Sequence, residues 1–387
     1  MKTHRTFFAV LVILTLLFSC KRNNIDHYEY TVPEYSNDGW DVASLNDVGI
    51  NSVRICEMMD FINENSGHNI HSILIFKNNK LVFEEYFEGY LYSSNPPGTN
   101  GEFIQYDEHT DHYLASVSKS ITSVILGAAV KEDYIDNLED KIIDLLPEYS
   151  DILTGEKADI TLKHLLTMTS GLDWDESSSS YGNPNNDVTA LFNSEDPVEY
   201  ILSRPLLYTP GSEFLYNSGN TNVIGAIIQK KTEMSLLDFG NEYLFNPLTI
   251  DGGTWQVLPG GYFFASGGIS LRPRGLAKIG SLFLNDGRWD NKQVITEEWI
   301  SESVMSHIDT EGRTLPSSHS YGYQWWIQDF SSNGIVYNSF LAAGWGDQYM
   351  IIFEERDMMV LINCGNYLSS GSISIMSLVE DFILDAL

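Results

Sequence analysis

Positively charged residues are scarce in this sequence: its 387 residues include 22 Lys and Arg against 53 Asp and Glu, and its net charge is −31. So acidic a surface repels the phosphates of nucleic acids and of anionic lipids. Nucleic acid is therefore excluded as a partner, and contact with a membrane would need an anchor instead of a basic surface. Neutral or cationic small molecules remain compatible with this charge.

Motifs for metal binding and redox chemistry are also missing. The sequence has three cysteines and contains neither paired C-x-x-C nor H-E-x-x-H, so we expect no metal or other cofactor. Cys56 and Cys364 lie too far apart in the sequence to indicate a disulfide framework, and we predict free thiols. The G-x-S-x-G turn of α/β-hydrolases is absent as well, which removes that route to a serine nucleophile.

The longest apolar run lies at the N-terminus, where Lys2 and Arg5 precede residues 7–18. Its length and flanks fit a secretory signal better than a membrane span. The tetrapeptide that ends at Cys20 is similar to a bacterial lipobox; the alternative is a plain signal peptide with an incidental cysteine. We therefore expect residues 1–19 to be removed and the protein to be exported to the periplasm or cell surface of a bacterial envelope, where a lipid on Cys20 anchors it without a membrane span.

The rest of the chain reads as a tether (20–48) followed by one domain (49–387). Runs rich in aromatic and β-branched residues lie near both ends of this domain, and helical periodicity dominates its middle. This order predicts an α/β (α+β) fold: a lobe with an antiparallel sheet flanked by terminal helices, from about 49–112 and 255–387, and an inserted, mostly helical lobe, from about 113–254. Residues 92–112 and 176–196 are predicted as loops, and a cleft between lobes is a common place for a site.

The segment 113–130 carries the first candidate residues. Its apolar residues recur with a helical period, which predicts a mostly buried helix. Ser116 and Lys119 lie near the start of this helix, and one turn brings the hydroxyl and the amine to the same side. A lysine in apolar surroundings loses some preference for its charged form and can act as a base. The pair is a candidate activated nucleophile; the alternative is that Ser116 caps the helix and Lys119 reaches solvent.

Several further segments accompany this S-x-x-K motif in a consistent order: 161–172 (TLKHLLTMTSGL), 210–225 (PGSEFLYNSGNTNVIG), 265–284, 293–303 and 344–348 (GWGDQ). Together they resemble the serine β-lactamase and penicillin-binding-protein superfamily. The resemblance is to its class C-like branch, with the family VIII esterases and the 6-aminohexanoate-dimer-hydrolase-like serine hydrolases. It runs from about residue 70 to the C-terminus and implies the β-lactamase/transpeptidase-like fold.

Carried over residue by residue, the resemblance implies that Ser116 is the nucleophile and Lys119 its activating partner. Tyr216 matches the tyrosine of the second motif, Y-x-N, which moves protons to and from the leaving group, and a neighbouring lysine ammonium would favour its phenolate. Two other tyrosines, Tyr35 and Tyr181, also begin a literal Y-x-N, but they lie in the tether and in a predicted loop.

The chain departs from the family pattern at two places. The third position of Y-x-N is Ser218, and the late K-T-G has no lysine, because Trp345-Gly346-Asp347 stands there and resembles the W-x-G of the esterase branch. We expect Ser218 and residues 345–348 (Trp345, Gly346, Asp347 and Gln348) to bind the substrate or its oxyanion. An aspartate there repels the carboxylate that such a lysine attracts. Trp325 and Trp326 are candidates for an acyl pocket, with core packing as the alternative for at least one of them.

The leading hypothesis is an exported serine hydrolase that cleaves an ester or amide through a Ser116 acyl-enzyme and does not recognise a carboxylate as β-lactamases do. Its partners would be small ester, amide or peptide-like substrates, and oligomeric state is left open. A second hypothesis is a D-amino or cell-wall peptidase, or a weak β-lactamase. A third, of another class, is an inactive scaffold that binds cell-wall fragments.

Overall fold

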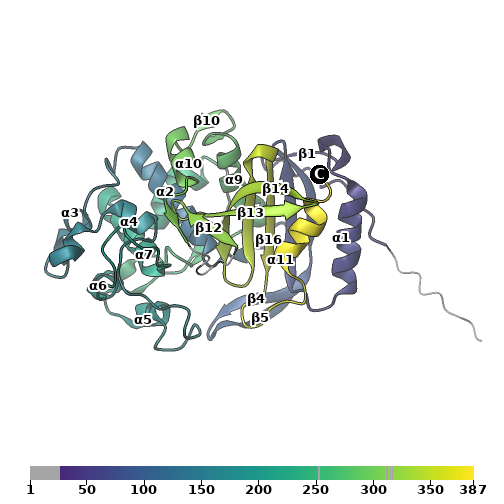
Figure 1. Ribbon diagram of the computed structural model, residues 1–387. Coiled ribbons are helices and arrows are strands. Elements are labelled where there is room, and N and C mark those ends of the chain that lie inside the picture. The colour runs from purple at the N-terminus through teal and green to yellow at the C-terminus, as the bar shows by residue number, and fades with distance from the viewer. Residues whose placement is uncertain (1–26, 252, 311–312, 314, 316) are drawn as a thin grey trace, which may run out of the picture.

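The computed structural model describes residues 27–251, 253–310, 313, 315 and 317–387. The expected signal peptide (1–19) and the lipidation site Cys20 lie outside these residues. In Figure 1 a sheet flanked by helices occupies one half of the molecule, and a group of helices occupies the other half. None of the helices within the described ranges is long and apolar enough to cross a membrane.

A large sheet forms the core of the first lobe, with the strand order β1-β3-β2-β16-β15-β14-β13-β12-β11. The strands are β1 (Asp41–Val42), β2 (Ile70–Lys77), β3 (Lys80–Tyr86), β11 (Ile308–Asp309), β12 (Ser318–Tyr321), β13 (Trp326–Ser332), β14 (Ile335–Gly344), β15 (Gln348–Phe353) and β16 (Met358–Cys364). Neighbouring strands are antiparallel except for β1 and β3. The N-terminal hairpin β2–β3 pairs with the last strand β16, so both ends of the domain build one sheet, as predicted.

Helices cover both faces of this sheet, which explains why its central strands are almost continuously apolar. Ile73 of β2 shares a core with α1 (Ser52–Glu64) and α11 (Ile375–Leu378). The next residue, Leu74, belongs instead to the core that includes α9 (Pro273–Leu284). Successive side chains of a strand point to opposite faces of the sheet, so β2 contributes side chains to both hydrophobic cores.

The second lobe is mainly helical, as predicted. It contains α2 (Val117–Lys131), α3 (Ile142–Leu145), α4 (Leu162–Leu166), α5 (Asp187–Asn193), α6 (Pro197–Ser203), α7 (Ser218–Thr232) and α8 (Leu236–Gly240). Another helix, α10 (Glu297–Ser303), follows α9 in the chain. Because α2 packs against α7 on one side and against β14 and β15 on the other, its N-terminus lies where the two lobes meet.

Three small sheets and several short helical turns complete the fold. The sheets are the hairpin β4 (Glu88–Ser94) with β5 (Pro97–Gln105), the group β6 (His112–Tyr113), β8 (Ile269–Leu271) and β7 (Thr254–Trp255), and the pair β9 (Arg288–Trp289) with β10 (Lys292–Gln293). Short 3-10 helices span Asn46–Val48, Pro147–Tyr149, Gly155–Asp159, Pro259–Gly261 and Glu354–Arg356, and π turns span Asn241–Phe245 and Val379–Ile383.

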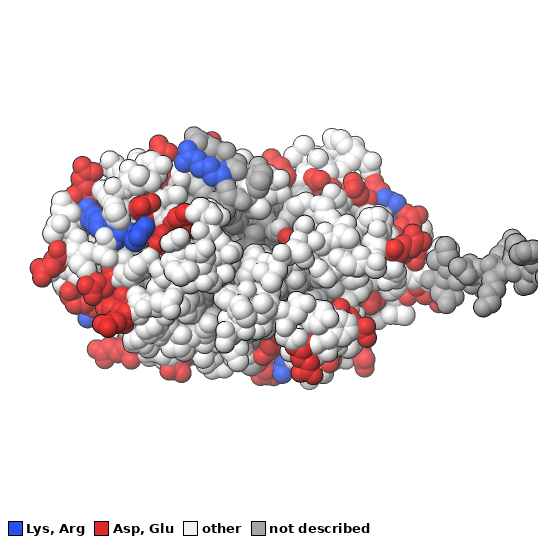
Figure 2. Space-filling view, turned by 90° about the horizontal axis from the view of Figure 1, so that it is seen from below, with Lys and Arg blue, Asp and Glu red and all other residues white. Residues whose placement is uncertain are grey.

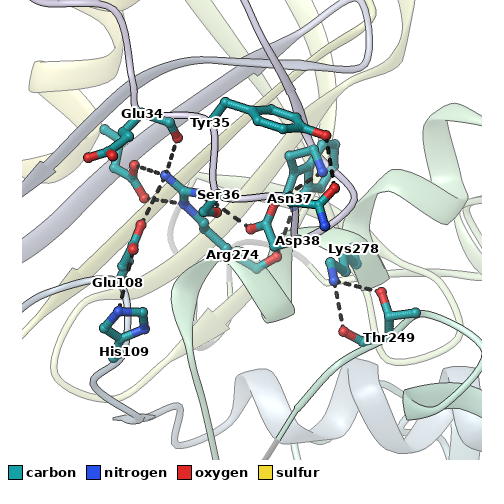
Figure 3. Close-up of polar contacts among 12 residues, drawn as sticks. Glu34, Tyr35, Ser36, Asn37, Asp38, Glu108, His109, Thr249, Arg274 and Lys278 are labelled. Carbon is teal, nitrogen blue, oxygen red and sulfur yellow. Dashed lines mark hydrogen bonds and ion pairs between the residues drawn. The ribbon is translucent and has the colours of Figure 1, made fainter.

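The folded domain begins before residue 49, which corrects the C-terminal part of the expected tether. Trp40 and Leu45 are buried, and β1 pairs with β3. Figure 3 shows what holds this segment: the guanidinium of Arg274 donates to the Ser36 hydroxyl and the Glu34 carbonyl and forms ion pairs with Asp38 and Glu108. Arg274 also forms an ion pair with Glu84 of β3. A polar segment read as a linker is therefore fixed by a cation more than two hundred residues away in the chain.

Two predicted loops contain regular structure. Part of 92–112 belongs to the β4–β5 hairpin, and α5 lies inside 176–196. In the hairpin, the Pro, Gly and polar residues of β5 and the serines of β4 interrupt the strand pattern, although Tyr90 and Phe103 pair across the two strands. The aromatic and β-branched run at 321–328 indicates one strand, but residues 322–325 separate β12 from β13. Polar residues such as Asn338 and Ser339 dilute the pattern of β14, which the sequence does not indicate.

Candidate active site

Ser116 occupies the N-cap position of α2, with φ −68° and ψ −8° and with no capping bond from its side chain. Its hydroxyl is therefore free for another partner. The neighbouring backbone is fixed because the Ser118 hydroxyl donates to the Ala115 carbonyl at 2.6 Å and accepts from the backbone N–H of Ile269 at 3.3 Å. The alternative in which Ser116 acts as a helix cap is not what the structure shows.

Lys119 points at this hydroxyl from one helical turn away. Its Nζ lies 2.9 Å from the Ser116 Oγ and 2.9 Å from the Ser266 carbonyl oxygen, and the residue is 1% exposed, so the alternative of a solvent-facing Lys119 is wrong. Burial lowers the pKa of the Lys119 amine to about 8, while the charge of Glu176 opposes this shift. A substantial fraction of Lys119 is then neutral near pH 8, when it can accept a proton.

The carbonyl that accepts from Lys119 is itself held in place. The side-chain amide of Asn222 on α7 donates to the Ser266 hydroxyl at 3.0 Å and accepts from the Ser266 backbone N–H at 3.3 Å. Asn222 and Ser266 are buried. Sequence reasoning missed both residues. They lie inside the family-like segments 210–225 and 265–284, but they meet only through the packing of α7 on the 254–268 segment.

Tyr216 completes the group around the hydroxyl. The Lys119 Nζ lies 4.8 Å from the centre of the Tyr216 ring, and the Ser116 hydroxyl is near enough to influence the pKa of Tyr216. Burial raises the pKa of Tyr216 well above its usual value, Tyr321 and Glu176 raise it further, and the Ser116 hydroxyl opposes this shift. The expected phenolate is thus corrected: Tyr216 stays protonated at rest, and Lys119 is the better proton acceptor.

Tyr216 is supported by Trp326, which stacks on its ring at 5.4 Å between ring centres. Trp325 is fully buried and packs on Phe283. Neither tryptophan is among the residues that line the cavity at Ser116, so the predicted acyl-pocket role of this pair is wrong. Core packing explains Trp325, and Trp326 positions the tyrosine.

Glu176 is a second group that sequence reasoning missed. Its carboxylate accepts from the Trp174 indole N–H at 2.6 Å and from the backbone N–H and hydroxyl of Ser218 at 2.9 and 3.0 Å. The negative charge raises the pKa values of Lys119 and Tyr216. Glu176 precedes a run of four serines in a predicted loop, where nothing in the sequence distinguishes it from a solvated carboxylate.

The residues of the predicted substrate-binding turn at 345–348 have different roles. Trp345 lines the cavity. Gln348 is fully buried, and its amide donates to the carbonyl oxygens of Gly346 and Cys364 at 2.9 and 2.6 Å, so it holds the turn and does not face a substrate. The Asp347 carboxylate accepts from Asn366 at 2.8 Å and from the Tyr349 hydroxyl at 3.3 Å and does not line the cavity either. The side chains of Gln348 and Asp347 thus have structural partners, and the predicted role of this turn in binding the oxyanion stays a prediction.

The backbone at the end of β14 comes very close to the nucleophile. A Cβ atom on Gly344 would lie 3.2 Å from the Ser116 backbone nitrogen and 2.4 Å from the Leu114 carbonyl oxygen. Only glycine permits this approach. The backbone N–H of Ser116 at the start of α2 is thereby held beside the strand end, where it can donate to an oxyanion.

A cavity of about 370 Å³ opens at Ser116. Ser218, Ser266, Trp345 and several aromatic side chains line it, and so does Tyr181, the tyrosine of the second literal Y-x-N, although Tyr216 is the one next to the nucleophile. Within the described part of the chain, no group of three or more His, Cys, Asp or Glu could hold a metal ion. The arrangement is a nucleophile, a base and a hydroxyl donor at the edge of a mainly apolar pocket.

Comparisons with known proteins agree with this geometry. The beta-lactamase family model matches residues 68–366. The 6-aminohexanoate-dimer hydrolase of Paenarthrobacter ureafaciens is 30% identical over 234 residues, which cover 56% of this chain and 57% of that protein. The chain thus spans little more than half the length of this curated relative.

Two solved structures share the fold. A penicillin-binding-protein homologue from Caulobacter crescentus has a TM-score of 0.66 at 14% identity, covering 87% of this chain and 97% of its own. A family VIII carboxylesterase has a TM-score of 0.65 at 12% identity, with the same coverage of both chains. The predicted fold class is confirmed. On the match over residues 68–366, the chain belongs to the beta-lactamase family.

Proposed function

We propose that this protein is a serine hydrolase that cleaves a carboxylic ester or amide through an acyl-enzyme on Ser116. The observation that carries the proposal is the buried Lys119 amine 2.9 Å from the Ser116 Oγ. A hydroxyl with a desolvated base within hydrogen-bond reach is the general signature of an activated nucleophile. The hydrolase names of the amide- and ester-cleaving relatives support the same class.

In the first half-reaction the neutral Lys119 amine takes the Ser116 proton while Oγ attacks the substrate carbonyl. The backbone N–H of Ser116 donates to the developing oxyanion. The Tyr216 hydroxyl gives a proton to the leaving oxygen or nitrogen, and the Lys119 ammonium, 4.8 Å from its ring, compensates the charge left on the tyrosine. In the second half-reaction water attacks the acyl-enzyme and gives a proton to the Tyr216 oxygen, while the Lys119 ammonium returns its proton to the departing Ser116 Oγ.

We further propose that the reacting end of the substrate carries no carboxylate. Trp345 stands in the cavity where a K-T-G motif would supply a lysine. Efficient hydrolysis of a penicillin together with inactivity on short acyl esters would refute this part of the proposal and favour the weak β-lactamase hypothesis.

The proposal is tested with a fluorophosphonate probe on the purified domain, residues 21–387. Wild type should be labelled once, and Ser116→Ala should not be labelled. Ser123→Ala is the matched control, because Ser123 lies on the same helix and its buried hydroxyl has no hydrogen-bond partner. An unlabelled, folded wild type would favour the scaffold hypothesis.

Export and anchoring form a separate proposal that rests on the sequence of residues 1–20. We propose that Cys20 is lipidated after removal of residues 1–19. Metabolic labelling with a fatty-acid analogue in a bacterial host should tag wild type and Cys56→Ala, and should not tag Cys20→Ala. A label that survives in Cys20→Ala would contradict the anchor.

A further inference from the structure

Two groups of apolar side chains enclose the cavity at Ser116. The first, which we call the tyrosine–tryptophan wall, consists of Tyr92, Tyr113, Tyr181 and Trp345. Within it the rings of Tyr92 and Tyr113 stack at 3.8 Å between centres, and Trp345 lies 4.6 Å from Tyr181. This wall is assembled from the β4–β5 hairpin, β6, the 176–186 segment and the β14–β15 turn.

The second group, the phenylalanine wall, consists of Val188, Phe192 and Phe264. Phe192 of α5 contacts Phe264 edge to face at 4.9 Å between ring centres. Figure 1 shows α5 and the β4–β5 hairpin in different parts of the lower edge of the molecule. Phe192 and Tyr92, one from each of these elements, both face the cavity that contains Ser116.

Charged groups are absent from both walls. Among the lining residues within the part of the chain that the structure describes, none is Asp, Glu, Lys, Arg or His. Glu176 lies behind Ser218, with its oxygens occupied by Trp174 and Ser218. Seen from below, the middle of the face is nearly free of charged side chains, and the abundant Asp and Glu gather around its margins (Figure 2).

A charged acyl group would have no counterion here. Moving an ionised group from water into an apolar site without a partner is strongly unfavourable. An aromatic ring, by contrast, gains apolar burial and edge-to-face or stacked contacts with such walls. The cavity volume of about 370 Å³ is at the small end of ligand sites, which suits a single ring or a compact branched chain.

We infer that the substrate is an uncharged ester or amide whose acyl group is an aromatic ring or a compact branched hydrocarbon, held between the tyrosine–tryptophan wall and the phenylalanine wall. The inference rests on the proposed hydrolase function and adds the substrate class. It distinguishes this protein from hydrolases whose substrates have an acyl chain that ends in an ammonium or a carboxylate.

The test compares p-nitrophenyl esters that differ only in the acyl group: phenylacetyl, 6-aminohexanoyl and hemisuccinyl. Values of kcat/KM are divided by the alkaline hydrolysis rate of each ester. The phenylacetyl ester should be preferred at least about tenfold over both charged esters. Phe192→Ala should lower kcat/KM for the phenylacetyl ester more than for p-nitrophenyl acetate, a small uncharged ester that serves as the reference.

A matched gain-of-function variant sharpens this test. Gln256 lines the cavity, and its backbone is held by bonds to Gly268 and Phe264, so Gln256→Glu adds a carboxylate at nearly constant shape. It should raise the relative rate on the 6-aminohexanoyl ester, whereas Asn291→Asp, an equal charge change at an exposed turn outside the cavity, should not.

The possible outcomes distinguish failure of the substrate inference from failure of the proposed hydrolase function. A wild type that is labelled by the fluorophosphonate but prefers a charged acyl group, or shows no preference, overturns the inference and leaves the hydrolase intact. A wild type that is neither labelled nor active on any of the esters overturns both.

Discussion

The start of α2 and the turn between β14 and β15 were both indicated by motifs, yet the structure gives their polar groups different tasks. At the start of α2, Lys119 and Tyr216 converge on one hydroxyl that caps nothing. In the turn, Gln348 and Asp347 satisfy carbonyl, amide and hydroxyl groups of the protein itself. A polar group is chemically useful where packing leaves a reactive atom available, and structural where every partner is already supplied.

The largest effect should come from Lys119. Replacing it by Met removes the base and should lower kcat by roughly 10³-fold or more, since removal of a member of a catalytic unit disables the whole unit. An apolar residue of similar length avoids the burial of an amine, so thermal stability should be unchanged or higher. Ester hydrolysis at constant folded concentration, with Tm by calorimetry, checks both. A Lys119→Met variant with near wild-type kcat would contradict the catalytic role of Lys119, and the start of α2 would then be structural like the β14–β15 turn.

Tyr216→Phe should come next. It keeps the stacking on Trp326 but deletes the hydroxyl that protonates the leaving group, so kcat should fall by roughly 10²–10⁴-fold. Substrates with a better leaving group need less protonation, and the loss should shrink across a series of phenyl esters of decreasing leaving-group pKa. A loss that is equal for all leaving groups would point to a structural role for Tyr216 instead.

Gln348→Ala tests the other region. Its buried amide has three carbonyl acceptors and also accepts from Asn363 and Cys364, so truncation leaves several groups without partners. The free energy of unfolding should fall by roughly 2–4 kcal/mol, measured by urea denaturation. The fluorophosphonate labelling rate of the folded fraction should change far less than in Lys119→Met. Unchanged stability together with lost labelling would show instead that Gln348 acts in the active site.

The smallest effect should come from Glu176→Gln. The carboxylate raises the pKa of Lys119, so its neutralisation should shift the acidic limb of the pH–rate profile to lower pH. The same change weakens the bonds to Ser218, which lines the cavity, so KM should rise as well. The profile of kcat separates these contributions. A shift to higher pH would mean that Glu176 acts on Lys119 in a way that its charge does not explain.

The sequence predicts the lobes, the two-ended sheet and the Ser116–Lys119 pair because each rests on local periodicity or on a motif. It does not predict Asn222, Ser266 or Glu176, which come together through packing between segments that no spacing rule connects. The burial of Trp40 was missed for the same reason, since Arg274 fixes the N-terminal segment from a distant helix. At residues 345–348 the motif located a turn beside the cavity, but the direction of each side chain depended on partners such as Asn366 and Cys364.

The central claim is that a neutral Lys119 amine activates Ser116. The most direct measurement is the second-order rate constant for labelling of Ser116 by an uncharged fluorophosphonate as a function of pH. We predict a rate constant that rises with pH, with its midpoint near the Lys119 pKa of about 8, and no labelling of Ser116→Ala. A rate that is constant between about pH 6 and pH 10, or a label on another residue, would contradict it.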